Sequence, residues 1–241
     1  ENIRQIIRKL TKSRIDIIEC GFLTEKTDFN ENITRFDKIE RLKNYIKRKN
    51  ESLYVLMANY GEYDFNKLPE NEGIIDGIRV AFHKEDLEKA LAVCQTIKKK
   101  GYKVFVQPMV SLRYTDSDFI ELLLQMNKIM PYAFYIVDSF GSMKERDLRR
   151  LFYLADHNLD ENILLGFHSH NNLQLALSNA QTLLNTNTER SLIIDSSVMG
   201  MGRGAGNLNT ELITQYLNKT GTPKYKIDYL LKIIDEVLTK F

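Results

Sequence analysis

Two histidines, His168 and His170, stand one residue apart directly after the apolar run Ile163–Leu165. On a β-strand, residues i and i+2 point to the same side, about 6.5 Å apart along the strand. Two imidazoles placed in this way can turn toward one metal ion, and histidine is the commonest metal ligand in proteins. The alternative is a pair of polar loop histidines before the next helix. The spacing therefore makes His168 and His170 candidate metal ligands.

A glycine-rich segment, Gly200–Gly206, follows the last expected strand and precedes a helix. Alternate glycines such as Gly202 and Gly204 let backbone N–H groups approach a substrate anion, and the helix N-terminus adds a positive dipole end. Arg203, between them, is a candidate to meet a carboxylate. The segment also satisfies a loose dinucleotide-binding pattern, but that pattern should open a βαβ unit, and only helical sequence follows it here. A flexible loop over the site is the alternative interpretation.

Carboxylate and hydroxyl side chains also stand at strand ends. Asp138 and Ser139 follow an apolar run, although both types are ordinary helix N-caps as well. Glu19 lies near the end of an otherwise apolar strand, where a carboxylate must be paired or functional because a buried charge is costly. We therefore take these three as candidate catalytic or substrate-binding residues. Weaker candidates at comparable positions are Asn59, Tyr60, Arg79, His83 and Gln107.

The elements that must position these side chains alternate along the chain. Short β-branched or aromatic runs are each followed by a longer amphipathic segment, which predicts parallel strands. The expected strands are Ile15–Cys20, Leu53–Met57, Gly77–Ala81, Lys103–Gln107, Ala133–Val137, Ile163–Phe167 and Leu192–Ile194. The expected helices are Asn2–Lys12, Thr34–Lys49, Lys84–Lys100, Asp116–Ile129, Met143–His157, Leu173–Leu184, Asn209–Asn218 and Lys226–Lys240.

This alternation predicts an α/β fold, a TIM (β/α)₈ barrel that forms a single catalytic domain over residues 1–241. The barrel needs eight strands, so we expect its first strand to lie upstream of Glu1. A doubly wound open sheet competes with this prediction, but it normally shows a glycine-rich turn after its first strand, and none occurs early here. In a barrel, the polar strand ends would meet at the C-terminal mouth, where TIM-barrel enzymes place their chemistry.

The composition excludes several functional classes. The 34 basic and 32 acidic side chains give a net charge of +2 without a concentrated basic field, which argues against nucleic-acid binding. No apolar run approaches the roughly 18 residues of a membrane span, and the first residues do not open a signal peptide. Cys20 and Cys94 stand apart, as expected for buried thiols in a reducing cytoplasm. We expect a cytoplasmic protein that binds neither nucleic acid nor a membrane.

Three motifs, His168–Asn172, Asp138–Gly141 and Gly200–Asn207, give the chain a specific resemblance. With them the chain resembles the DRE-TIM metallolyases, a superfamily that includes isopropylmalate synthases, HMG-CoA lyases and 4-hydroxy-2-oxovalerate aldolases. The resemblance implies that His168 and His170 bind a divalent metal, and that the asparagine closing the glycine loop, Asn207, is a further ligand. It also matches Glu19 to the glutamate that ends the second barrel strand of the family.

The chain departs from the family pattern in two places. The D-x-x-x-R-D-G segment of the first strand, which supplies an aspartate ligand and a substrate-binding arginine, does not occur between Glu1 and Phe241. The CoA lyases carry a cysteine in the glycine loop, where this chain has Met199 and Met201. The pattern is most similar to the aldolase branch, which cleaves 4-hydroxy-2-oxoacids to pyruvate and an aldehyde.

The resemblance implies a carbon–carbon lyase that acts on a small-molecule 2-oxoacid with a divalent metal as Lewis acid. The ligand types suit Mn²⁺, Mg²⁺, Co²⁺ or Zn²⁺. Two alternatives stay open: an acyl-CoA condensing enzyme of the isopropylmalate synthase type, and a catalytically silent barrel that binds a metal or a small acid. The sequence also leaves open the general base, the aldehyde, a dehydrogenase partner and the formation of a homo-oligomer.

Overall fold

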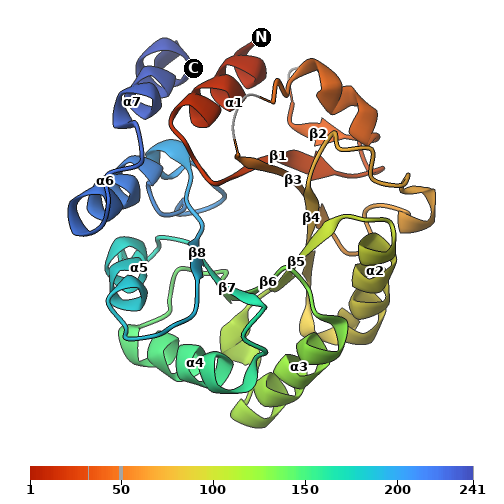
Figure 1. Ribbon diagram of the computed structural model, residues 1–241, viewed down its shortest axis with the longest axis vertical. Helices are drawn as coiled ribbons and strands as arrows, with labels where there is room; N and C mark the ends of the chain where they lie inside the picture. Colours follow the sequence, from red (N-terminus) through yellow and green to blue (C-terminus); the bar gives the residue numbers. More distant parts are fainter. Residues whose placement is uncertain (32, 49–50, 241) are drawn as a thin grey trace.

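The computed structural model describes residues 1–31, 33–48 and 51–240. One parallel sheet of eight strands, in the order β2-β1-β3-β4-β5-β6-β7-β8, curls into a ring inside a layer of helices (Figure 1). The strands are β1 (Ile17–Leu23), β2 (Arg35–Phe36), β3 (Leu53–Asn59), β4 (Gly77–Phe82), β5 (Lys103–Pro108), β6 (Ala133–Asp138), β7 (Leu164–Ser169) and β8 (Leu192–Ile194). The α-helices are α1 (Asn2–Lys12), α2 (Leu87–Lys99), α3 (Asp116–Ile129), α4 (Glu145–Asn158), α5 (Ala176–Leu184), α6 (Thr210–Thr220) and α7 (Ile227–Glu236).

Strand residues alternate between the interior of the ring and the layer beneath the helices. On β6, Tyr135 and Val137 pack with Phe105 of β5 in a cluster made of residues from the strands and their immediate ends, which is the interior. The intervening Phe134 and Ile136 belong to the large core between sheet and helices. Both faces of β6 are therefore buried, as the continuous apolar sequence predicts.

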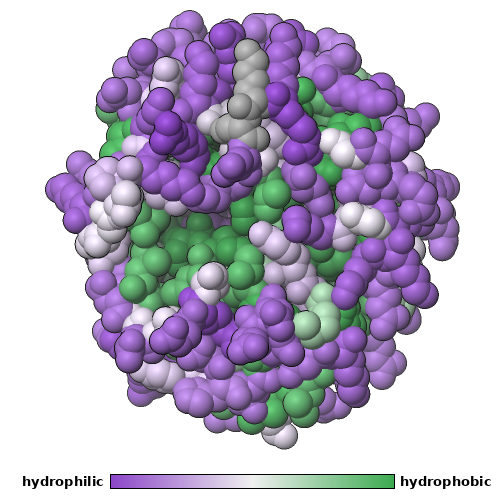
Figure 2. Space-filling model, in the orientation of Figure 1, coloured by the Kyte–Doolittle hydropathy of each residue, from purple (hydrophilic) through white to green (hydrophobic). Residues whose placement is uncertain are grey.

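The sheet ends at β2 on one side and at β8 on the other, and neither β1 nor β2 pairs with β8 in the part of the chain that the structure describes, so the ring is open there. Helices α1 and α7 lie side by side at this opening (Figure 1), where Ile6 and Leu10 of α1 pack on Leu230 and Ile233 of α7. The face shown in Figure 2 is hollowed and apolar near its centre and rimmed by hydrophilic side chains. The expectation that a first barrel strand lies upstream of Glu1 stays a prediction.

The expected helix over Thr34–Lys49 is wrong for the described part of that range; Lys49 lies outside the described residues. Arg35–Phe36 forms β2, and a short 3₁₀-helix, η1 (Ile39–Asn44), follows it. Both are fixed by packing, because Phe36, Ile39 and Leu42 are completely or almost completely buried. Tertiary contacts therefore override the helical periodicity of this segment.

Strand β2 can join the sheet because β1 is irregular. Its register against β3 shifts between Glu19 and Phe22, and Gly21 has a φ of +142°. A Cβ at Gly21 would lie 2.3 Å from the carbonyl oxygen of Thr34. The glycine thus allows the Thr34 carbonyl to accept a hydrogen bond from the Phe22 N–H at 2.8 Å. The other expected elements are present, with small differences at their ends.

None of the helices that the structure describes is both long and apolar enough to cross a membrane.

Candidate active site

A buried arginine, Arg79 on β4, joins side chains from four other parts of the sheet. Its Nε lies 3.1 Å from Oε2 of Glu19 on β1, and its Nη1 donates to Oε1 of Gln107 on β5 at 3.0 Å. Its Nη2 donates to Oδ1 of Asp195, directly after β8, at 3.1 Å, and Nη1 donates to the other Asp195 oxygen. The guanidinium also lies 4.5 Å from the ring centroid of Tyr135 on β6.

Local strand geometry explains why Arg79 points into the ring. Arg79 lies on the same strand face as Gly77. The missing side chain of Gly77 leaves room for the Phe105 ring on β5, because a Cβ at Gly77 would lie 2.7 Å from that ring. Barrel interiors are ordinarily filled by apolar side chains, and a buried charge needs compensation. Arg79 receives it from two carboxylates. An arginine in this place therefore indicates a site built to hold charge.

His168 on β7 is connected to Arg79 through Asp195. Its Nδ1 lies 3.0 Å from Oδ2 of Asp195. Its ring centroid is 5.4 Å from that of His170, and the two ring planes are 75° apart. We call Glu19, Arg79, Gln107, Tyr135, His168 and Asp195 the Arg79 cluster. The structure thus brings Glu19 and the two histidines among the predicted metal ligands into one region.

Burial and charge set the protonation of this region. Burial raises the pKa of Glu19, and Arg79 only partly offsets that rise. Burial acts on Asp195 in the same direction, but the charge of Arg79 and the contact with His168 together lower its pKa to about 2. Burial and the neighbouring His168 lower the pKa of His170. At neutral pH, Asp195 is therefore ionised and His170 is neutral, the form that binds metals.

The glycine loop lies against the end of β7. His170 and Asn207 form an antiparallel bridge, and the Asn171 N–H donates to the Gly206 carbonyl at 3.0 Å. The side chain of Asn207 donates through Nδ2 to the Met201 carbonyl at 2.9 Å, while its Oδ1 is buried and has no hydrogen-bond partner among the residues that the structure describes. A buried amide oxygen without a partner is unusual and is a suitable ligand for a cation.

These residues fit part of a divalent-metal site. Two imidazoles, of His168 and His170, and the oxygen of Asn207 supply neutral donors that divalent metals accept. Within residues 1–31, 33–48 and 51–240, no group of three or more His, Cys, Asp or Glu side chains could hold a metal ion. The donor set is therefore short of a negatively charged ligand.

Asp138 and Ser139, at the end of β6, have local partners. The two carboxylate oxygens of Asp138 accept the backbone N–H groups of Ser142 and Met143, each at 3.0 Å. Its carbonyl accepts the N–H of His170 at 3.1 Å, and Ser139 Oγ accepts the N–H of Val110 at 2.9 Å. These contacts favour a role in shaping the rim. The catalytic role of Asp138 and the substrate-binding role of Ser139 stay predictions.

Three further predicted residues, Gly202, Arg203 and Gly204, lie on the exposed part of the glycine loop. A Cβ at Gly202 would lie 2.4 Å from Nδ2 of Asn207, whereas one at Gly204 would meet nothing within 4 Å. Gly202 therefore leaves the space that the Asn207 side chain occupies. The roles of Gly202, Arg203 and Gly204 toward a substrate stay predictions.

Of the weaker candidates, Asn59 ends β3, Tyr60 follows it and His83 follows β4, so all three lie at the same rim. Arg79 and Gln107 prove central to the cluster, and Asp195 is a residue that sequence reasoning missed. The alternation of inward-facing and outward-facing residues along a strand could have identified Arg79 and Gln107. Arg79 lies two residues after Gly77, and Gln107 two after Phe105, on the strand faces that point inward.

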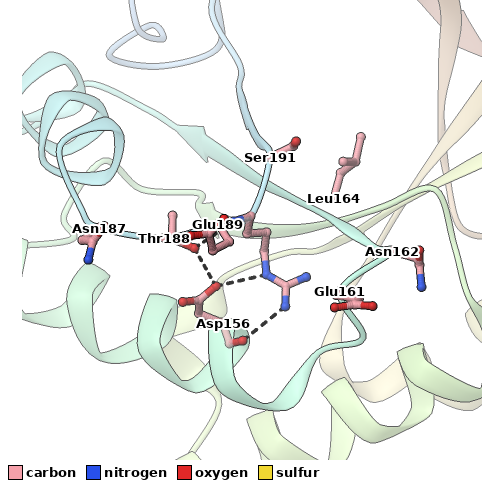
Figure 3. Close-up of a pocket in the computed structure, with 9 residues that line it drawn as sticks. Asp156, Glu161, Asn162, Leu164, Asn187, Thr188, Glu189 and Ser191 are labelled. Atoms are coloured by element: carbon pink, nitrogen blue, oxygen red, sulfur yellow. Dashed lines mark hydrogen bonds and ion pairs between the residues drawn. The ribbon is translucent and has the colours of Figure 1, made fainter.

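A cavity of about 620 Å³ lies at the opposite end of the strands, where β7 and β8 begin (Figure 3). Its Arg190 donates to Oδ1 of Asp156 at 3.1 Å and to the carbonyls of Leu159 and Ile163 at 2.8 and 2.9 Å. These bonds tie the end of α4 to the start of β8. Residues at this end of a TIM barrel serve stability, and we read Arg190 in this way.

Residues 78–237 match the HMGL-like family model. The 4-hydroxy-2-oxovalerate aldolase of Bacillus cereus (strain 03BB102) is 32% identical over 163 residues, which cover 66% of this chain and 44% of that enzyme. The chain thus spans less than half the length of this curated relative.

Two solved structures share the fold and confirm the TIM-barrel prediction. The N-terminal domain of a putative aldolase from Bacteroides vulgatus matches with a TM-score of 0.82 at 25% identity, over 100% of this chain and 81% of that one. The HMG-CoA lyase of Bacillus subtilis matches with a TM-score of 0.78 at 17% identity, over 99% and 85% of the two chains. The family model covers most of the chain, and the motifs are those of the DRE-TIM enzymes; the chain belongs to the HMGL-like family.

Proposed function

We propose that this chain is the barrel of a divalent-metal-dependent lyase that cleaves a 4-hydroxy-2-oxoacid to pyruvate and an aldehyde. The observation that carries the proposal is the junction of Glu19, Arg79, Asp195 and His168, from four different strands or strand ends, beside His170. The relatives named 4-hydroxy-2-oxovalerate aldolase support the choice of substrate class.

In this proposal His168, His170 and Asn207 hold the metal, and a carboxylate on the expected first strand completes the set. The bound ion supplies Lewis-acid stabilisation of the enolate that forms when the carbon–carbon bond breaks. Mn²⁺ is the first ion to test, with Mg²⁺, Co²⁺ and Zn²⁺ as alternatives, because neutral nitrogen and oxygen ligands suit all four.

Glu19 is our candidate to exchange a proton with the 4-hydroxyl group. Its side chain is 33% exposed, whereas that of Asp195 is 14% exposed, so Glu19 is the carboxylate of the cluster that a substrate can reach. Its raised pKa brings proton affinity closer to neutral pH, where a general base works best. Removal of the hydroxyl proton then breaks the bond between C3 and C4. The aldehyde leaves, and pyruvate forms when C3 of the enolate takes up a proton.

The decisive assay measures pyruvate release from 4-hydroxy-2-oxovalerate by the full-length natural protein with added Mn²⁺. We expect EDTA, His168→Ala and His170→Ala each to abolish release while the fold, monitored by circular dichroism, stays intact. Activity that survives EDTA, or that persists in both histidine variants, would refute the metal mechanism.

A silent barrel is the second candidate, because the described donor set has no charged ligand. Metal binding without turnover on a panel of hydroxy-oxoacids would favour it. An acyl-CoA condensing enzyme would instead release free CoA from acetyl-CoA and a 2-oxoacid.

For each of these functions we propose a cytoplasmic location, since Cys20 and Cys94 are buried free thiols. Partners other than the small 2-oxoacid, including a second copy of the chain, are open to measurement by light scattering.

A further inference from the structure

We propose that Asp195 and Arg79 are positioning residues that keep a proton on Nδ1 of His168, so that Nε2 is the ring nitrogen offered to a cation. The identity of that cation rests on the proposed function. The tautomer itself does not, because it is a property of the protein without metal.

The first step is the contact between Asp195 and His168. Nδ1 lies 3.0 Å from Oδ2, within hydrogen-bond distance. An ionised carboxylate can only accept, so the proton in this bond belongs to Nδ1. A neutral imidazole carries one N–H, and Nε2 then keeps a free lone pair. Free histidine in water prefers the opposite tautomer, so the carboxylate reverses an intrinsic preference.

The second step is the immobility of Asp195. Arg79 donates to both of its oxygens, in the two-pronged arrangement that fixes a carboxylate in a plane. Arg79 is itself held by Gln107 at 3.0 Å and by the Tyr135 ring at 4.5 Å. Its side chain is 6% exposed. The ring of His168 is thus oriented from within the barrel, through a chain of buried contacts.

The third step separates this arrangement from an ordinary buried ion pair. Glu19 alone would balance the charge of Arg79, yet Asp195 faces the same guanidinium. One cation against two carboxylates leaves an excess of negative charge, which is costly in the interior. That excess lies against Nδ1 of His168, through Asp195. It favours a cation bound to the far nitrogen of the same ring.

His170 provides an internal contrast. The backbone of His170 is bridged to Asn207, and backbone groups of Arg203 and Gly206 lie near its ring, so the glycine loop contacts it. His168 is held by buried side chains instead. We therefore expect loop variants to change His170 and to leave the tautomer of His168 intact.

The test is long-range ¹H–¹⁵N correlation NMR of the metal-free, full-length protein with ¹⁵N-labelled histidine. This chain has four histidines, and His168→Gln assigns the relevant signal. We expect Nδ1 of wild-type His168 to carry the proton. In Asp195→Ala we expect Nε2–H to appear, whereas the matched control Glu19→Gln, which alters the same arginine without touching His168, should keep Nδ1–H. A wild-type His168 protonated on Nε2, or an unchanged tautomer in Asp195→Ala, overturns the proposal.

A second readout is the binding of Mn²⁺ alone, measured by titration calorimetry on the same proteins. We expect Asp195→Ala to weaken binding by about 10–100-fold, the usual effect of removing a group that supports a histidine ligand. Binding within about twofold of wild type would overturn the proposal. If Asp195→Ala does not fold, the wild-type spectrum still decides the question, because Nε2–H on wild-type His168 overturns the proposal.

The outcomes separate this inference from the proposed function. If His168 carries Nδ1–H and loses it in Asp195→Ala, the inference holds even where no hydroxy-oxoacid releases pyruvate. If pyruvate release depends on Mn²⁺ while His168 carries Nε2–H, the proposed function holds and the inference fails.

Discussion

Glu19 and Asp195 contact the same guanidinium although they lie on opposite sides of the opening in the barrel. Glu19 lies on β1 and Asp195 directly after β8, and these strands do not pair with each other among the described residues. Arg79, across the ring on β4, lies 3.1 Å from an oxygen of each. Where backbone hydrogen bonds do not close the ring, buried charges connect its two sides.

Arg79→Met should therefore destabilise the protein strongly. It leaves the largely buried Asp195 and the one-third-exposed Glu19 without their cation. Removal of one partner of a buried pair typically costs about 3–5 kcal/mol, and we expect the lower end because water partly solvates Glu19. Urea unfolding measures the loss. Arg149→Met, which breaks an exposed helical pair with Glu145, is the matched control and should change little. If the two variants lose the same free energy of unfolding, Arg79 contributes no more to stability than an exposed ion pair does.

Asp195 should make the protein sensitive to acid. The pKa of this carboxyl is lowered from 3.8 to about 2 by Arg79 and His168 against the effect of burial. A lowered pKa stabilises the fold at pH values above the unfolded pKa, and this contribution is lost as the pH falls toward 2. The free energy of unfolding of wild type should thus fall more steeply between pH 4 and 2 than that of Asp195→Asn. Parallel curves would contradict the lowered pKa.

Gly202→Ala should weaken metal binding through Asn207. The new Cβ would lie 2.4 Å from Nδ2 of Asn207, so the amide must move and its free oxygen moves with it. We expect Mn²⁺ affinity to drop by about 10-fold or more, with little change in Tm, since the loop is exposed. Gly204→Ala is the control for backbone strain in the same loop, because φ is +60° there but a Cβ meets nothing within 4 Å. A larger loss of affinity in Gly204→Ala would exclude this role of Gly202.

Asp138→Ala tests whether the carboxylate shapes the rim or takes part in catalysis. The variant removes the hydrogen-bond acceptor of the Ser142 and Met143 N–H groups, and loss of such capping bonds typically costs about 1–2 kcal/mol. If shaping is its role, stability falls and kcat/KM drops less than about 10-fold. A loss of about 10²–10⁴-fold in kcat at unchanged stability would instead show a proton-transfer role.

The sequence predicts most of the barrel because its signals are local. Apolar runs and helical periodicity identify β1, β3 to β8 and all but one of the expected helices. The failure at Thr34–Lys49 has a non-local cause, since β2 depends on the close approach of Thr34 to Gly21 in another segment. The spacing of apolar residues within Thr34–Lys49 does not predict that contact.

The same distinction applies to the site. His168 and His170 share one strand end, so their spacing alone predicts a common region. Arg79 and Asp195 are 116 residues apart, and their contact exists only after the strands have curled into a ring. Their importance follows from strand parity combined with the barrel geometry, neither of which is visible in a single motif.

The packing of α1 on α7 also constrains how the molecule is made. Lys9 donates to the Lys232 carbonyl at 3.3 Å across 223 residues, and Ile6 and Leu10 are covered by Leu230 and Ile233. During translation α1 leaves the ribosome long before α7 exists, so Ile6 and Leu10 lack this partner until the chain between the two helices has been made. Such late, long-range contacts slow folding and expose nascent chains to aggregation. We expect ribosome-bound chains that end before Ile227 to bind chaperones through α1, and release to coincide with the emergence of α7.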